Sequence, residues 1–360
     1  SGNISGNSSL NGIVIANSTG AAGTLTLSGS NSFTSGMSIN NGGTVVAGNN
    51  NAFGNNHSQT AGIYLKNGTI DVGSYNVNAS GSDGKGVIWI GNGTITASGG
   101  GTLTAGSFKE LSGLHTGLVY ISASLAGAGT AYAVNGSGTT VLSASNSFTG
   151  VTTVSSGTLV LSNSFALGGS TFDSTGLATG GRLVFGTNSS AFTFAGLQGS
   201  GTLALTNSLN QGIALTVGGN NTNTIFSGAL TDGGIGGSLN KAGTGTLTLT
   251  GTNTYTGNTF ISGGTLAFAN ESAFGSGAVT ATGTSTLLAA TNLSVTNAIA
   301  VNSAVNLTLN NGGFAVTNTG LISGSGTLIA SGAGTSTLNP GTGKTNSIDS
   351  LTINAGTTVA

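Results

Sequence analysis

Few residues in this chain of 360 have side chains suited to catalysis. It carries seven Asp and Glu, six Lys and Arg, two His and no Cys. Two carboxylates facing one sugar are the usual machinery of glycoside hydrolysis. No two acids of this chain lie within one short strand where they could face a common sugar; they are Asp71, Asp83, Glu110, Asp173, Asp232, Glu271 and Asp349. The spacing therefore argues against a catalytic carboxylate pair.

The remaining ionisable residues give no stronger signal. We expect the neighbouring opposite charges, Asp83 with Lys85 and Lys109 with Glu110, to form exposed salt bridges or solvated loop charges. His57 and His115 are isolated, and a Ser-His-Asp site using His57 and Asp71 lacks the turn that such sites require. We predict no catalytic residue, no cofactor and no metal ligand.

One glycine-rich segment is similar to a calcium-binding nonapeptide repeat. This segment, residues 233–238, lacks the ligand Asp, and nothing repeats every nine residues. We expect a plain glycine-rich corner there.

Composition excludes several classes of protein. A net charge of −1 offers no basic footprint for nucleic acid, and the absence of Cys excludes disulfides and thiolate metal sites. No stretch approaches the roughly 18 consecutive apolar residues of a membrane span, so we expect no membrane insertion of this segment. The chain begins at Ser1, as a processed chain or a fragment would. The chain is 37% hydrophobic and 4% charged, with a mean hydropathy of +0.26, which disfavours disorder.

Internal repeats predict the architecture. An Asn followed two positions later by an aromatic residue and then Thr occurs three times at similar intervals, as Asn31 and Phe33, Asn146 and Phe148, and Asn253 and Tyr255. Each pair precedes a Gly-Thr-Leu or Gly-Thr-Val and an Ala-Phe-Gly or Ala-Leu-Gly. We take the six residues as structural landmarks of super-repeats at roughly 22–135, 136–242 and 243–360, with 1–21 the end of a preceding repeat.

A shorter repeat lies inside each super-repeat. It appears as Gly-Thr followed by Leu, Ile or Val at Gly23, Gly43, Gly68 and Gly93. These intervals are typical of one coil of a parallel β-helix, with Leu and Thr alternating at a period of two and Asn-Gly dipeptides at the corners. The sequence thus predicts an all-β solenoid, a right-handed parallel β-helix of about 15 to 18 coils that is continuous over residues 1–360.

Threonine spacing raises one further possibility. Rows of Thr on a flat solenoid face would suggest ice binding, but Thr-x-Thr at Thr24, Thr102 and Thr246 does not recur on successive coils. The pattern therefore disfavours that function.

The third super-repeat resembles a known family motif. The run from Lys241 to Leu266, KAGTGTLTLTGTNTYTGNTFISGGTL, is similar to the passenger-associated transport repeat of autotransporter passenger domains. Residues 336–353 resemble another stretch common in those passengers. The resemblance implies a right-handed parallel β-helix exported across the outer membrane of a Gram-negative bacterium to the cell surface or the medium, and the absence of Cys suits such export.

Two classes of function follow. The first is a non-enzymatic extracellular structural or adhesive protein, a stalk or fibre segment that mediates self-association, biofilm formation or surface attachment. Its low charge gives little electrostatic repulsion between copies, and its termini read as consecutive coils, which favours lateral or head-to-tail association into filaments. The alternative is a β-helix that binds or cleaves polysaccharide, with surface glycans as partners.

Overall fold

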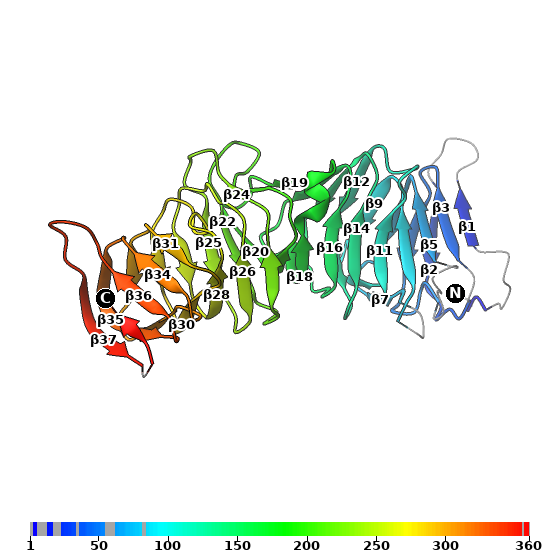
Figure 1. The fold of residues 1–360 in the computed structure, drawn as a ribbon. Coiled ribbons are helices and arrows are strands. Elements are labelled where there is room, and N and C mark those ends of the chain that lie inside the picture. The colour runs from blue at the N-terminus through cyan, green and yellow to red at the C-terminus, as the bar shows by residue number, and fades with distance from the viewer. Residues whose placement is uncertain are drawn as a thin grey trace. The chain divides into compact units, whose positions relative to one another are not determined.

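The chain folds almost entirely into short parallel β-strands. The computed structural model describes residues 3–5, 13–16, 23–33, 36–54, 62–80, 84–354 and 356–359. The strands stack as a β-solenoid of about 14 turns, interrupted by one short 3₁₀ segment, η1 (Ser174–Ala178) (Figure 1). The predicted all-β parallel solenoid is confirmed, but the predicted 15 to 18 coils were too many because several coils are longer than the prediction assumed. In the described residues, no helix is long and apolar enough to cross a membrane.

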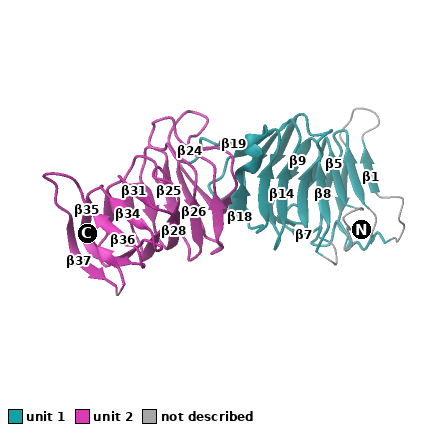
Figure 2. Cartoon of the chain, in the orientation of Figure 1, with its two compact units in different colours: residues 1–189 teal, residues 190–360 magenta. Residues whose placement is uncertain are grey.

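Two compact units divide the chain. Unit 1 spans Ser1–Ser189 and unit 2 spans Ser190–Ala360 (Figure 2). This division does not coincide with the predicted super-repeat boundaries. A single continuous solenoid over residues 1–360 stays a prediction.

Unit 1 is built from three columns of parallel strands. Sheet A stacks β1 (Ile13–Ala16), β3 (Met37–Asn40), β5 (Ile63–Lys66), β8 (Val87–Ile90), β11 (Ser107–Glu110), β14 (Ala131–Val134), β16 (Val151–Val154) and β18 (Leu167–Asp173). Sheet B stacks β2 (Thr24–Leu27), β4 (Thr44–Ala47), β6 (Gly68–Asp71), β9 (Gly93–Thr96), β12 (Leu118–Ile121), β15 (Thr139–Leu142), β17 (Thr158–Leu161) and β19 (Arg182–Phe185). Sheet C stacks β7 (Asn76–Asn78), β10 (Thr102–Thr104) and β13 (Ser124–Ala126).

Unit 2 repeats this construction. One column stacks β20 (Ala191–Gln198), β22 (Ala214–Val217), β25 (Ser238–Lys241), β27 (Thr259–Ile261), β29 (Val279–Ala281), β32 (Ile299–Val301) and β35 (Ile322–Ser331). A second stacks β23 (Thr224–Phe226), β26 (Thr246–Leu249), β28 (Gly264–Phe268), β30 (Ser285–Ala289), β33 (Asn306–Asn310), the end of β35 and β37 (Ser347–Ile353). Smaller columns pair β21 (Leu203–Ala204) with β24 (Leu230–Thr231), and β31 (Leu293–Val295) with β34 (Ala315–Asn318), β36 (Thr335–Leu338) and β38 (Thr358–Val359).

The core is a set of apolar rows that run from coil to coil. A strand turns alternate side chains inward, and parallel stacking in register places each inward residue on the one below. The inner row of sheet B shows this most regularly: Leu25, Val45, Ile70, Ile95, Ile121, Leu142, Leu161 and Phe185. At the predicted corners, Asn41 and Asn67 adopt left-handed φ angles of 50° and 66°, which Asn tolerates better than most residues.

Candidate functional site

The three landmark Asn residues make the same contacts in all three repeats. The Oδ1 atom of Asn31 accepts a hydrogen bond from the backbone N of Ile4, and its Nδ2 donates to the carbonyl of Ala52. In the same way, Asn146 accepts from the backbone N of Leu125 and donates to the carbonyl of Ala166. Asn253 accepts from the backbone N of Leu230 and donates to the carbonyl of Ala273. All three side chains are buried. Each Asn therefore joins its own coil to the coils on both sides.

The landmark aromatic residues lie inside the solenoid. Phe33, Phe148 and Tyr255 are at most 2% exposed. The Tyr255 hydroxyl forms a hydrogen bond with Thr259 Oγ1, 2.5 Å away, which satisfies its polar end in the core. These contacts show that the landmark Asn and aromatic residues stabilise the solenoid. Since each Asn bonds only to the coils next to its own, the structure does not bring the three sets together into one site.

Several acidic residues accept hydrogen bonds from backbone N–H groups and so stabilise the local backbone. Asp71 accepts hydrogen bonds from the backbone N of Gly73 and of Ser98, and Asp173 caps η1 through the backbone N of Thr175. Glu271 accepts from the backbone N of Ser294, whereas Asp349 is exposed. In the described part of the chain no group of three or more His, Asp or Glu could hold a metal ion. His57 and Asp83 lie outside the described residues.

Glu110 corrects the expectation of an exposed charge. Because β11 alternates its side chains, Lys109 points outward and Glu110 points into the core, where it is 1% exposed. There its Oε2 lies 2.6 Å from Nδ1 of the fully buried His115. Thr140 Oγ1 donates to Glu110 Oε1, and so does the Tyr132 hydroxyl at 3.4 Å. Glu110 therefore pairs with His115 in the core rather than with Lys109 at the surface.

Two glycines make room for this buried pair. A Cβ at Gly136 would lie 2.4 Å from Cβ of His115, and one at Gly138 would lie 2.7 Å from its Nε2. Burial opposes protonation of His115, but the hydrogen bond and charge of Glu110, together with the backbone of Thr139 and Gly117, outweigh it and raise the pKa of His115. The pair therefore supports the fold as an ion pair, and its burial keeps it from any substrate.

A pH dependence of stability follows from this raised pKa. The contribution of His115 to stability is complete below its ordinary pKa of 6.5 and is lost as the pH rises through the raised folded value. We expect the unfolding temperature of the chain to fall over this range relative to that of His115→Gln. Thermal melts of both proteins from mildly acidic to mildly alkaline pH measure the difference. Parallel curves would contradict the assignment.

Asp232 corrects the expectation of a plain glycine-rich corner at residues 233–238. Its carboxylate accepts hydrogen bonds from the backbone N of Gly234, Gly236, Gly237 and Thr256, and from the Thr256 hydroxyl, at 2.7 to 2.9 Å. Burial alone would raise the pKa of Asp232, but these bonds lower it to about 2. The Asp organises the loop itself, so its oxygens are already occupied.

Lys241 is a second buried charge. It is 1% exposed, and its Nζ donates to the carbonyls of Ala242, Gly243 and Gly263 at 2.7 to 3.3 Å. Burial lowers the pKa of Lys241 to about 8. The ammonium group thus joins two successive coils rather than meeting solvent.

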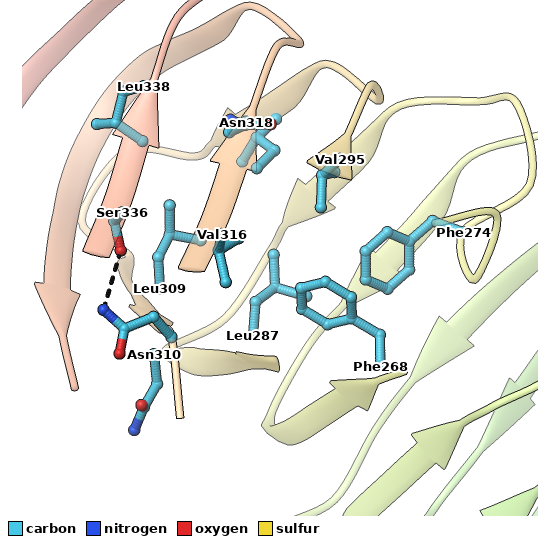
Figure 3. A pocket seen from close by; sticks show the side chains of 12 residues that line it. Phe268, Phe274, Leu287, Val295, Leu309, Asn310, Val316, Asn318, Ser336 and Leu338 are labelled. Carbon is cyan, nitrogen blue, oxygen red and sulfur yellow. Dashed lines mark hydrogen bonds between the residues drawn. The ribbon is translucent and has the colours of Figure 1, made fainter. Parts of the chain in front are cut away.

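A cavity lies inside unit 2 (Figure 3). Its volume is about 30 Å³, and its walls include Phe268, Phe274, Leu287 and the buried Asn318, whose amide atoms have no partner among the described residues. Such a space admits one or two waters. Typical ligand sites are at least ten times larger, so this cavity is not a substrate pocket.

The outer face of sheet B carries an ordered row that the sequence concealed. Thr24, Thr44, Thr69 and Thr94 lie in register on four successive coils. Single Thr residues thus recur on successive coils, whereas Thr-x-Thr does not, because Val46 and Asp71 stand two positions after Thr44 and Thr69. The row continues as Tyr120, Val141, Val160 and Val184.

Two large apolar side chains protrude from this face. Leu118 is 56% exposed and Tyr120 is 41% exposed, both on β12. They make the face uneven midway along its length, which does not suit the flat surface expected for ice binding. They also leave apolar area in contact with water.

Comparison with protein families decides what the repeats are. The family described as passenger-associated-transport-repeat matches residues 19–47, 134–161 and 239–268. Three segments of the chain thus match the passenger-associated transport repeat. Curated proteins and solved structures gave no match.

Each passenger-associated transport repeat contains one landmark pair. Asn31 and Phe33 lie in the first, Asn146 and Phe148 in the second, and Asn253 and Tyr255 in the third, which also contains Lys241. Together with the β-solenoid fold, the three repeats are consistent with the passenger domain of an autotransporter, and they imply surface display or secretion. The Asn contacts give these repeats a physical role, which is to join successive coils.

Proposed function

We propose that this protein is a non-enzymatic structural passenger that associates laterally with copies of itself through the outer face of sheet B in unit 1. The observation that carries the proposal is the exposed Tyr120 within a long row of β-branched residues, with the exposed Leu118 beside it on the same strand. Association of surface-displayed copies would hold neighbouring cells together, which is the basis of adhesion and biofilm formation.

The chemistry of this face favours a second copy as its partner. Thr and Val side chains are short and stiff, so they lose little conformational entropy when another surface covers them. Exposed Tyr is a frequent anchor at protein interfaces. The charged residues in the described strands of this face are Asp71 on β6 and Arg182 on β19, which leaves the strands between them uncharged. An identical surface on a second copy is complementary to such a face by two-fold symmetry.

The acidic residues support a structural assignment rather than a catalytic one. Glu110 is buried with His115, and Asp71, Asp173, Asp232 and Glu271 accept hydrogen bonds from nearby backbone N–H groups. Carboxylates used in this way are not free to transfer protons to a sugar. We therefore favour the stalk or fibre segment over polysaccharide cleavage.

Substitution of Tyr120 tests the association. Tyr120→Arg places like charges opposite each other in a two-fold pair, and we expect the self-association constant to fall at least tenfold, equivalent to about 1.4 kcal/mol. Sedimentation velocity over a concentration series measures this fall, and settling of cells displaying the chain measures its consequence.

Thr153→Arg is the matched control, since Thr153 is a half-buried outward residue of β16 on sheet A. It should associate as the unmodified chain does. Equal association of Tyr120→Arg would contradict the proposed face, and end-to-end filaments in electron micrographs of both variants would favour head-to-tail polymerisation instead.

A further inference from the structure

A polar hollow lies at the corner of unit 1 where the strands of sheet A lead into those of sheet B. Its volume is about 410 Å³, and it is lined by Asn40, Asn41, Lys66, Asn67, Asn92 and Leu114. The three Asn corners belong to the successive coils that follow β3, β5 and β8. Coils repeat at about 4.8 Å, so the hollow is elongated along the stacking direction. Its volume falls within the range of ligand sites.

The lining is rich in amide groups with unused hydrogen-bonding capacity. Asn92 Oδ1 accepts hydrogen bonds from the backbone N of Thr116 and Gly117, which fixes this side chain. Its Nδ2 group, and the side chains of Asn41 and Asn67, make no hydrogen bond within the described part of the chain. An amide both donates and accepts, as a sugar hydroxyl does. The hollow is therefore suited to a polyhydroxylated ligand.

One lysine, Lys66, lines the hollow, and a second, Lys109, lies two coils further along sheet A, outside the lining. Tyr64 and Trp89 pair in register on β5 and β8, with ring centroids 6.2 Å apart and ring planes at 11°. Lys66 Nζ lies 5.4 Å from the Tyr64 ring, and Lys109 Nζ lies 5.6 Å from the Trp89 ring. Both ammonium groups contact aromatic rings, which hold them by cation–π attraction without neutralising their charge.

In the described part of the chain, the outward row that contains Tyr64, Trp89 and Lys109 reaches no acid close to Lys109. Beyond Lys109 the row continues through Ala133 and Thr153 before it reaches Asp173, three coils further on. Glu110, the neighbour of Lys109 in sequence, points into the core toward His115. Lys66 and Lys109 thus lie two coils apart on the outer face of sheet A, and neither forms a salt bridge with a described acid.

We propose that this hollow binds a carboxylate-bearing polysaccharide, with the Asn amides on its hydroxyls and with Lys66 and Lys109 on its carboxylates. Two lysines, with no wider basic patch among the described residues, give too small a basic footprint for nucleic acid. Leu114 is the one large apolar residue of the lining, so a peptide with apolar anchors has little to fill. Binding here is a second activity, beyond the self-association proposed above.

Trp89 provides the readout, because it is the one Trp of the chain. Titration with polygalacturonate should change the Trp fluorescence in a saturable manner, and raised salt should weaken the binding. The combined variant Lys66→Gln and Lys109→Gln should bind at least tenfold more weakly, and Asn67→Ala at least threefold more weakly. The basic control, Lys344→Gln in unit 2, should bind as the unmodified chain does.

The polymer controls separate charge from sugar. Fully methyl-esterified polygalacturonate keeps the hydroxyls but loses the charge, and we expect it to bind at least tenfold more weakly. Polyglutamate that bound as tightly as polygalacturonate would overturn the proposal in favour of an acidic peptide. Undiminished binding by the double Lys variant, or no binding by the unmodified chain, would also overturn it. Sedimentation of the double Lys variant should show unchanged self-association, which keeps the two proposals separable.

Discussion

Substitution of Asp232 by Ala should lower the free energy of unfolding of unit 2 by about 4 kcal/mol. The carboxylate accepts five hydrogen bonds, four of them from backbone N–H groups, and it is fully buried. A hydrogen bond to a charged group contributes about 1.5 to 3 kcal/mol, and buried donors left without an acceptor add a desolvation cost. The total is smaller than five such terms because the loop of residues 233–238 can open to water.

Chemical denaturation, followed through a signal that reports on unit 2, measures this loss. The control is Asp349→Ala. Asp349 is an exposed acid of the same unit, so its removal should change stability by no more than about 0.5 kcal/mol. The contribution of Asp232 is present above its ordinary pKa of 3.8 and is lost as the pH falls through about 2. A loss below about 1 kcal/mol at neutral pH would show that the carboxylate does not organise the loop.

Substitution of Asn253 by Ala should destabilise unit 2 by about 3 kcal/mol. The change removes two hydrogen bonds and leaves the backbone N–H of Leu230 and the carbonyl of Ala273 buried without partners. Asn253→Asp should not restore stability, because a carboxylate cannot donate to the Ala273 carbonyl. Asn146→Ala should produce a loss of similar size in unit 1, since its contacts are the same.

The control is Asn302→Ala, which removes an exposed amide from the same unit. We expect it to change stability by no more than about 0.5 kcal/mol. Urea denaturation of the four variants compares them under one condition. Equal stability of Asn253→Ala and Asn302→Ala would mean that the bridge between coils contributes nothing measurable.

Much of the fold is predictable because stacking demands repetition. A residue placed inside one coil, such as Val45, must be matched by a similar residue in the next, such as Ile70, so the apolar pattern recurs visibly along the chain. Corners need left-handed backbone, which explains the recurring Asn-Gly. The recurrence of Asn31, Asn146 and Asn253 likewise indicates a common structural role, although their partners one coil away cannot be named from spacing alone.

The remaining features depend on register, which sequence spacing conceals. The Thr row takes a shorter step from Thr24 to Thr44 than from Thr44 to Thr69, so no single period aligns it. The partner of Asp232 is Thr256, one coil further on, and that coil has its own length. Glu110 and Lys241 both point inward from strands whose side chains alternate between the core and the outer face in the usual way. Nothing in the neighbouring residues indicates that these inward positions hold charged side chains.

The Asn bridges also bear on how the molecule would respond to being pulled. Asn253 joins Leu230, in the preceding coil, to Ala273, in the following one, so these coils cannot peel away singly while the bridge holds. Under tension, the segment between those two residues should yield as one block and release about 150 Å of contour length. A surface fibre built in this way would extend in a few large steps at its bridges, and between them it would resist load as a stiff rod.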